Sequence, residues 1–304
     1  MLALSEFVSK HLSATATYPK HDIGVISITG TDAKKFLQGQ TTCDINKLSA
    51  EAGLYGAICS NKGRIICNFF MLQKDDSILM LMSQDLIASS LTHLKKYAVF
   101  FKTDLTDATG MFQITETLSV SHESTKPEQF AEQLPITTDM GSIQLQLLSY
   151  PFNIHWHVTQ ANQTEHQESN PILSGLSLLA ARPLIQLEQS ENLLPQWINM
   201  QTTGGISFTK GCYTGQEIVA RMQYRGKSKK QLALATWQGD MDTQQALLDS
   251  EGKNLGQVLS VEQIGDDHIA QIILNQDITE CSELFLDGAK IHLIELPYQQ
   301  PFAD

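Results

Sequence analysis

Short apolar segments separated by turn residues recur along the 304-residue chain, and this pattern constrains the fold more than any other feature. Residues 53–60 and 64–73 flank the turn Asn61-Lys62-Gly63, which predicts a β-hairpin. Residues 22–30 alternate apolar with small or polar side chains, and 77–83 form another apolar run, so both are predicted strands. A meander of this kind favours antiparallel sheet.

Helical signals interrupt the strands at two places. Thr31 and Asp32 stand in capping positions before a short predicted helix, and residues 83–100 place Leu86, Ile87, Leu91 and Leu94 at helical spacing. Strand patterns return near residues 142–159, and beyond Lys230 they become short segments broken by glycine and aspartate. We therefore predict an α+β domain over residues 1–226 and a small C-terminal β-barrel over residues 227–304.

The charge of the chain limits the partners that it can meet. Hydrophobic residues make up 42% and charged residues 18%, which is a globular composition. The formal net charge is −12, from 21 basic and 33 acidic side chains. This balance argues against whole-surface binding of nucleic acid or of an anionic membrane. An anionic partner must therefore be met by a local basic patch.

The N-terminal segment does not have the pattern of a signal peptide, and no apolar run has the length of a membrane span. These features predict a cytoplasmic protein with no membrane partner. Five scattered cysteines form no C-x-x-C pair: Cys43, Cys59, Cys67, Cys212 and Cys281. We expect neither a disulfide framework nor a metal or iron–sulfur cluster of the protein's own.

The segment KGCYTGQE, residues 210–217, is the strongest candidate site. Thr214 and Glu217 fit the T-x-x-E capping box, so a helix is predicted to start near Gly215. Cys212 would then precede the positive end of that helix, with Lys210 two residues away, and both effects favour thiolate over thiol. Gly211 lets the backbone bend or approach a ligand. The alternative is that Cys212 is a small buried hydrophobic side chain under a helix start.

Five cations follow the predicted helix start: Arg221, Arg225, Lys227, Lys229 and Lys230. Against a net charge of −12 they form a local anion site for RNA or for a polycarboxylate cofactor tail. We expect Arg221 to pair with Glu217 across one helical turn. The alternative is that the other four cations only solvate a linker.

His155 and His157 lie two residues apart on one face of a predicted strand, with Trp156 on the other. A metal pair is conceivable, but no third ligand is evident, so partnered or exposed strand histidines are favoured. Motifs of the G-x-S-x-G, P-loop and G-x-G-x-x-G kinds are absent from the sequence, which leaves hydrolase, NTPase and dinucleotide-binding functions unsupported.

KGCYTGQE resembles the signature of the YgfZ-type folate-binding proteins, which are described as tRNA-modifying and are linked to the maintenance of iron–sulfur enzymes. Other segments resemble the family in the same order: residues 28–44, 61–65, 94–102, 193–230 and 291–298. The resemblance covers most of the chain and is least distinctive at about 103–170.

The family is similar in fold to the T-protein of the glycine cleavage system. The resemblance implies α+β subdomains around a central folate-sized channel, closed by a C-terminal barrel. It also implies tetrahydrofolate or a derivative as ligand, and a functional cysteine at Cys212 with Lys210 beside it. The motif residues that would support them are Gly211, Tyr213, Thr214, Gly215, Gln216, Glu217 and Arg221.

Two departures from the family pattern affect the expected folate contacts. Ile23 and Leu173 stand where members of the family carry tryptophans, and Leu179-Ala180-Ala181 replaces E-A-G. A carboxylate is a natural partner for the N–H groups of a pterin, so its loss weakens that contact. We expect weaker folate binding, or a site rebuilt from other residues such as Trp197.

Three functions are compatible with these features. The leading hypothesis is a folate-binding accessory protein that acts through Cys212 and supports iron–sulfur enzyme assembly or repair and tRNA methylthiolation. Its partners would be iron–sulfur or tRNA-modifying enzymes, and tRNA itself. The second is a folate-dependent one-carbon (aminomethyl) transferase, which makes enzymatic activity an open question. The third is an RNA-binding module.

Overall fold

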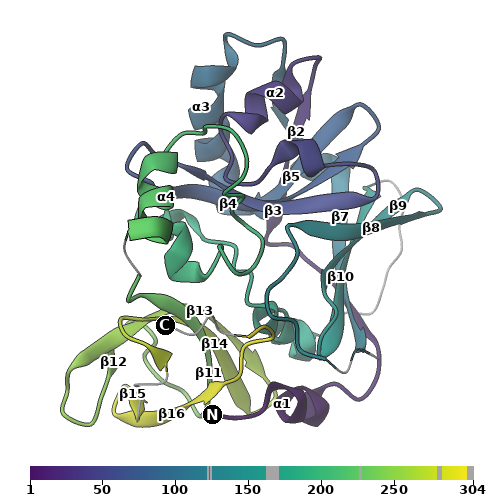
Figure 1. Ribbon diagram of the computed structural model, residues 1–304. Helices are drawn as coiled ribbons and strands as arrows, with labels where there is room; N and C mark the ends of the chain where they lie inside the picture. The colour runs from purple at the N-terminus through teal and green to yellow at the C-terminus, as the bar shows by residue number, and fades with distance from the viewer. Residues whose placement is uncertain (122, 124, 162–170, 226–227, 279–282, 300–304) are drawn as a thin grey trace.

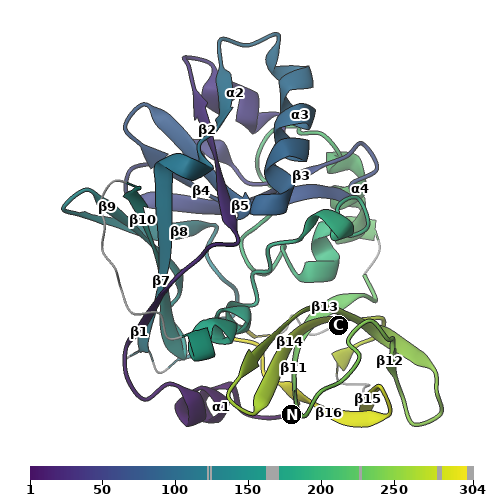
Figure 2. The same cartoon turned by 180° about the vertical axis from the view of Figure 1, so that it is seen from behind.

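The computed structural model describes residues 1–121, 123, 125–161, 171–225, 228–278 and 283–299. It consists of a large curled sheet with helices on its flanks and a closed barrel below it, as Figure 1 shows and Figure 2 repeats from behind. All strand pairs in both parts are antiparallel, apart from one isolated parallel bridge between Leu2 and Ile294.

The large sheet has ten strands. In spatial order they are β1 (Ala16–Pro19), β7 (Phe112–Val120), β10 (Phe152–Gln160), β9 (Ser142–Leu148), β8 (Gln133–Asp139), β3 (Ala52–Cys59), β4 (Ile65–Lys74), β5 (Ser77–Ser83), β2 (Ile23–Thr29) and β6 (Asp104–Asp107). The junction between β8 and β3 is short, since only Ala52 and Gly53 of β3 pair there. The sheet can therefore bend at this point into two halves.

Few helices accompany the strands. The α-helices are α1 (Leu4–His11), α2 (Ala33–Gln38), α3 (Ile87–Ala98) and α4 (Gln216–Arg225). The 3₁₀ turns are η1 (Ile45–Lys47), η2 (Gln84–Leu86), η3 (Thr109–Met111), η4 (Pro171–Ala180), η5 (Leu187–Gln189) and η6 (Pro195–Ile198). Helices α2 and α3 lie on the same side of the sheet, at the top of Figure 1, and α4 lies beside β4.

The barrel closes in the order β11 (Gln231–Gln238), β14 (Asp267–Leu274), β13 (Asn254–Ile264), β12 (Leu247–Leu248), β15 (Leu284–Leu286) and β16 (Ala289–Ile294). Strand β11 shows how the barrel has two apolar faces. Ala233, Ala235 and Trp237 belong to the core inside the barrel. Leu232 and Leu234, on the opposite face of the strand, belong to the core shared with the rest of the molecule.

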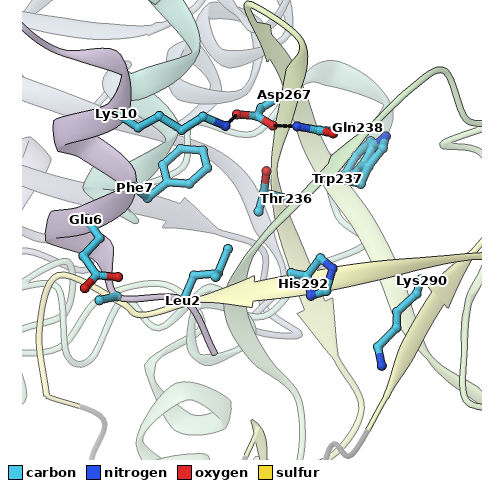
Figure 3. A pocket seen from close by; sticks show the side chains of 11 residues that line it. Leu2, Glu6, Phe7, Lys10, Thr236, Trp237, Gln238, Asp267, Lys290 and His292 are labelled. Carbon is cyan, nitrogen blue, oxygen red and sulfur yellow. Dashed lines mark hydrogen bonds and ion pairs between the residues drawn. The ribbon is translucent and has the colours of Figure 1, made fainter.

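The N-terminal segment packs on the barrel. The Leu2 amide donates to the Leu293 carbonyl (2.8 Å), Lys10 of α1 forms an ion pair with Asp267, and the His11 Nε2 lies 3.0 Å from the Asp267 carboxylate. A cavity of about 600 Å³ lies between α1 and the barrel. Figure 3 shows the side chains that line it. Burial tends to raise the pKa of Asp267, but hydrogen bonds from Lys10 and Gln238 and the nearby positive charges hold that pKa below its usual value. Asp267 thus fastens α1 to the barrel.

The predicted fold class is confirmed in its antiparallel sheet, its few helices and its C-terminal barrel. The hairpin of β3 and β4 and the strands β2, β5, β9, β10, β11, β13, β14 and β16 lie where the sequence predicts them. Strands β1, β6, β7, β8, β12 and β15 were not among the predicted strands. The exposed faces of β7 and β8 carry threonine, serine, glutamine, proline and aspartate, and the buried face of β7 includes Glu116, so the apolar side of each strand gives only a weak signal.

Glu116 of β7 is a fully buried carboxyl group. It accepts hydrogen bonds from the Tyr18 hydroxyl and the Trp156 indole N–H, and its side chain also bonds to Ser177. Burial raises the pKa of Glu116 to about 8, although the bonds from Trp156 and Ser177 act in the opposite direction. Glu116 therefore joins β1, β7, β10 and η4 through a carboxyl group that keeps its proton near neutral pH.

We predict that Glu116 makes the stability of the protein depend on pH. Because the folded-state pKa lies above the ordinary value of 4.5, the folded protein retains a proton that the unfolded chain loses. Its contribution is fully present below about pH 4.5 and is lost as the pH rises through about 8. Urea unfolding at pH 5 and pH 8.5 should show wild type losing roughly 3 to 5 kcal/mol more than Glu116→Gln. Equal losses in the two proteins would contradict this assignment.

Candidate functional site

Lys210 is buried, and its ammonium group joins two distant segments of the chain. Its Nζ donates to the backbone carbonyls of Gln38 (2.9 Å), Thr41 (2.6 Å) and Cys43 (2.8 Å). It also lies 5.1 Å from the centre of the Tyr213 ring. Burial lowers the pKa of Lys210 to about 8, and Cys43 and Asp44 act weakly in the opposite direction. All three hydrogen bonds go to carbonyls at the end of α2 or just after it, so Lys210 holds the motif loop against this segment.

Gly215 brings the start of α4 against the β3–β4 hairpin. Its φ is +85°, and a Cβ at this position would lie 2.5 Å from the Ser60 carbonyl oxygen. Across the same contact, Gly63 has φ +70° and approaches Ile218 so closely that an added Cβ would lie 2.8 Å from the Ile218 Cβ. Gly215 at the start of α4 and Gly63 in the hairpin turn therefore allow the helix and the hairpin to approach each other closely.

The start of α4 differs from the predicted capping box. The helix begins at Gln216, whose side-chain Oε1 accepts from the Tyr213 amide (3.3 Å). The Thr214 amide donates to the Gly39 carbonyl (3.2 Å). Neither a Thr214–Glu217 hydrogen bond nor a Glu217–Arg221 ion pair occurs within the part of the chain that the structure describes. The T-x-x-E spacing matches, but the positive φ of Gly215 and the contact with Gly39 set the geometry instead.

Cys212 is exposed, whereas the other described cysteines, Cys43, Cys59 and Cys67, are buried. Burial raises the pKa of Cys43 and of Cys67 to about 11, and it raises the pKa of Cys59 well above its usual range. The alternative that Cys212 is a buried hydrophobic side chain is wrong. Cys281 lies outside the described residues. Among the described cysteines, Cys212 is thus the one that a solvent-borne partner can reach.

A cationic cluster surrounds Trp197, which lies half-buried in η6. The Lys230 Nζ lies 4.1 Å and the Arg64 Cζ 4.8 Å from the centre of the indole ring. The sequence analysis did not single out Arg64, because it is a lone cation next to the hairpin turn. Arg221 and Lys229 are exposed, and neither belongs to an ion pair between described residues. Lys227 and the Arg225 side chain lie outside what the structure describes.

The expected folate contacts are spread over several elements. Ile23 is buried at the start of β2, opposite Ser83 of β5. The side chain of Leu173 lies outside the described residues. Leu179 is fully buried in the apolar core, and Ala181 is buried with φ +52°, a conformation that favours glycine. The position of the missing carboxylate is thus filled by packed apolar atoms.

Three glutamines near the motif carry buried amide oxygens that have no partner among the described residues: Gln40, Gln196 and Gln201. The Gln196 Nε2 donates to the Val219 carbonyl of α4 (2.7 Å), and Gln40 follows Gly39, the partner of Thr214. An unpartnered buried acceptor is costly unless a ligand or water supplies a donor. Amide oxygens can accept hydrogen bonds from the N–H groups of a pterin, so the chemistry of these side chains is compatible with a folate.

His155 and His157 are half-buried on one face of β10, and Trp156 on the other face is buried. Burial lowers the pKa of both histidines, and the charge of His157 lowers that of His155 further. A search of the described residues finds no group of three or more His, Cys, Asp or Glu side chains that could hold a metal ion.

Comparison with known proteins supports a family assignment, although no protein-family model matches the chain. The chain is 32% identical over 287 residues to the tRNA-modifying protein YgfZ of Yersinia pseudotuberculosis serotype IB, covering 86% of this chain and 85% of that protein. It is 33% identical over 240 residues to the tRNA-modifying protein YgfZ of Colwellia psychrerythraea, covering 74% of each. The chain belongs to the YgfZ family of tRNA-modifying proteins.

The fold of this YgfZ-family chain is similar to that of the glycine cleavage system aminomethyltransferase T from Bartonella henselae. The TM-score is 0.61 at 13% identity, and the match covers 93% of this chain and 86% of the other. The described residues of the YgfZ-family chain contain no helix long and apolar enough to cross a membrane. In this chain, Lys210 and Gly215 hold the segment KGCYTGQE, residues 210–217, against α2 and the β3–β4 hairpin.

We predict that Gly215→Ala destabilises the protein by about 2 kcal/mol or more, because a Cβ there combines positive φ with a clash against Ser60. Gly211→Ala is the matched control, since its Cβ would meet nothing within 4 Å. Chemical denaturation of both variants measures the difference. Equal stability of the two variants would show that the contact of α4 with the hairpin contributes nothing.

Proposed function

We propose that the protein is a folate-binding accessory factor in tRNA modification that acts through the Cys212 thiol. Its clients would be iron–sulfur enzymes, including those that methylthiolate tRNA. The observation that carries the proposal is the exposure of Cys212 on a loop fixed on both sides. On one side of Cys212, the buried side chain of Lys210 anchors the backbone. On the other side, Tyr213 is buried.

The fixed loop determines what Cys212 can do. The other described cysteines, Cys43, Cys59 and Cys67, are buried, so they do not compete with Cys212 for a partner in solution. Lys210 and Gly215 are positioning residues, since they hold the backbone on either side of the thiol. An exposed thiol on a fixed loop can meet a partner protein, or a reactive sulfur that the partner carries, without a rearrangement of the fold.

Folate would bind next to this loop. The Gln196 and Gln40 amide oxygens would accept from the N–H groups of the pterin, in place of a carboxylate at Leu179. Arg64 and Lys230, which lie over the Trp197 ring, would meet the carboxylates of the glutamate tail. When bound, a reduced folate supplies a carrier of one-carbon units. The lack of a carboxylate at Leu179 counts against the alternative aminomethyl transferase, which an aminomethyl-transfer assay would detect.

We predict that tetrahydrofolate binds and that Gln196→Met weakens its binding by about tenfold, because the variant removes a buried acceptor. Isothermal calorimetry measures the dissociation constant, and a thermal melt checks that the variant is folded. Thr209→Ala, an exposed change close to the motif, is the control. Unchanged affinity would remove Gln196 from the site, and no heat from wild type at millimolar ligand would remove folate from the proposal.

We predict that Cys212→Ala and Cys212→Ser both fail to restore tRNA methylthiolation in a deletion strain, although both fold normally. The thiol is exposed, so its removal leaves no cavity and should change stability by less than about 0.5 kcal/mol. Mass spectrometry of digested tRNA measures the modification, and Thr209→Ala is expected to complement fully. Full complementation by Cys212→Ala would refute the role of the thiol.

A further inference from the structure

A pair of large apolar side chains projects from the end of α3. Val99 is 72% and Phe100 85% exposed, although such residues usually pack in a core. The turn that carries them is fixed: the Phe101 ring packs 5.4 Å from the Phe36 ring, and the Lys102 amide donates to the Asp32 carboxylate (2.9 Å). The exposure of Phe100 is therefore built into the anchored turn.

Three lysines stand within a few residues of this turn in the sequence. Lys95, Lys96 and Lys102 are exposed, and none belongs to an ion pair between described residues, in a chain of net charge −12. Cations near a helix C-terminus favour the helix dipole, which accounts for Lys95 and Lys96. The dipole does not account for Lys102, which lies beyond the helix, or for the exposed Phe100.

A cavity of about 390 Å³ lies along the same helix. Ser89, Thr92, His93 and Lys96 line it from α3, and Ser190 and Glu191 line it from the two positions after η5. The lining positions Ser89, Thr92, His93 and Lys96 follow the three- and four-residue spacing of one helix face, and Val99 and Phe100 follow in the turn directly after the helix. The His93 Nε2 is buried and has no hydrogen-bond partner among the described residues.

We propose that this face of α3, from Ser89 to Phe100, binds a short single-stranded segment of RNA. Phe100 offers its ring for stacking on one base, and Lys95, Lys96 and Lys102 meet the phosphates. The cavity takes a neighbouring base, with His93 and Glu191 as hydrogen-bonding partners for its edge. From Ser89 to Ala98 the helix spans about 14 Å, and the turn that carries Phe100 extends the surface further, which leaves room for more than one nucleotide.

Charge and shape together favour RNA over other partners. The lysines select a polyanion, which an acidic protein surface or an anionic membrane would also provide. A flat aromatic platform and a polar cavity on one helix face suit bases, since every base has both a π-face and a hydrogen-bonding edge. The inference rests on the proposed function only in taking RNA as the relevant polyanion. It does not depend on Cys212 or on folate.

Fluorescence anisotropy with a labelled 12-nucleotide single-stranded RNA of mixed sequence tests the proposal on the full chain. Phe100→Ala should weaken binding by about tenfold or more, because it removes the stacking platform. The triple change Lys95→Gln, Lys96→Gln and Lys102→Gln should weaken binding. It should also reduce the slope of log K against log salt by about 2, since each lost phosphate contact removes about 0.7.

Two controls match these changes elsewhere on the surface. Met140→Ala alters an apolar side chain that is 94% exposed on the β8–β9 turn, and Lys253→Gln alters an exposed lysine of the barrel. Both should bind RNA like wild type. Thermal melts check that all variants are folded, and vesicles of phosphatidylglycerol and phosphatidylcholine test the membrane alternative.

Three outcomes would overturn the inference. The first is no binding of wild type to the RNA at low salt, and the second is equal RNA affinity of Phe100→Ala and wild type. The third is that Phe100→Ala or the triple lysine variant loses vesicle binding but keeps its RNA affinity. Cys212→Ala should bind the RNA normally. If Cys212→Ala binds RNA but fails in complementation, both proposals stand. If wild type does not bind RNA while Cys212 remains essential in vivo, only this inference fails.

Discussion

A single buried ammonium group holds the candidate site together. Lys210 satisfies its three donors with carbonyls that lie 167 to 172 residues earlier in the chain. An ammonium group removed from water is costly unless such partners are present, and here the carbonyls of residues 38, 41 and 43 form a ready cage. The loop that presents Cys212 therefore has its position set by the segment after α2. Any change that moves one of these segments also moves the other.

The sequence predicted the elements of this site better than the contacts between them. Alternation and turn residues located most strands, since the period of a half-buried strand is a local property. The T-x-x-E spacing at Thr214 also looked like a local signal, but the helix start depends on Ser60 and Gly39, which no local pattern contains. The role of Lys210 was missed for the same reason. Cys212 lies two residues from Lys210 in the sequence, whereas the hydrogen-bond partners of Lys210 lie far away along the chain.

Because the chain is acidic overall, its basic clusters are the places where an anionic partner is expected. Arg64 and Lys230 gather at Trp197, and Lys95, Lys96 and Lys102 gather at the end of α3. In a chain of net charge −12, anions are repelled by most of the surface and are attracted at these two places. Arg64 could not be found from charge runs, because a cation that stands alone in sequence joins a cluster only through the fold.

The pairing of Leu2 with β16 bears on how the molecule is assembled during synthesis. The Leu2 amide and carbonyl bond to Leu293 and Glu295, so the partners of this residue are synthesised 291 and 293 residues after it. The large sheet contains only residues before 161 and can form while the barrel is still being made. Helix α1 must then wait for Asp267 and β16 before it packs. Docking of α1 on the barrel is accordingly expected to follow the formation of the large sheet.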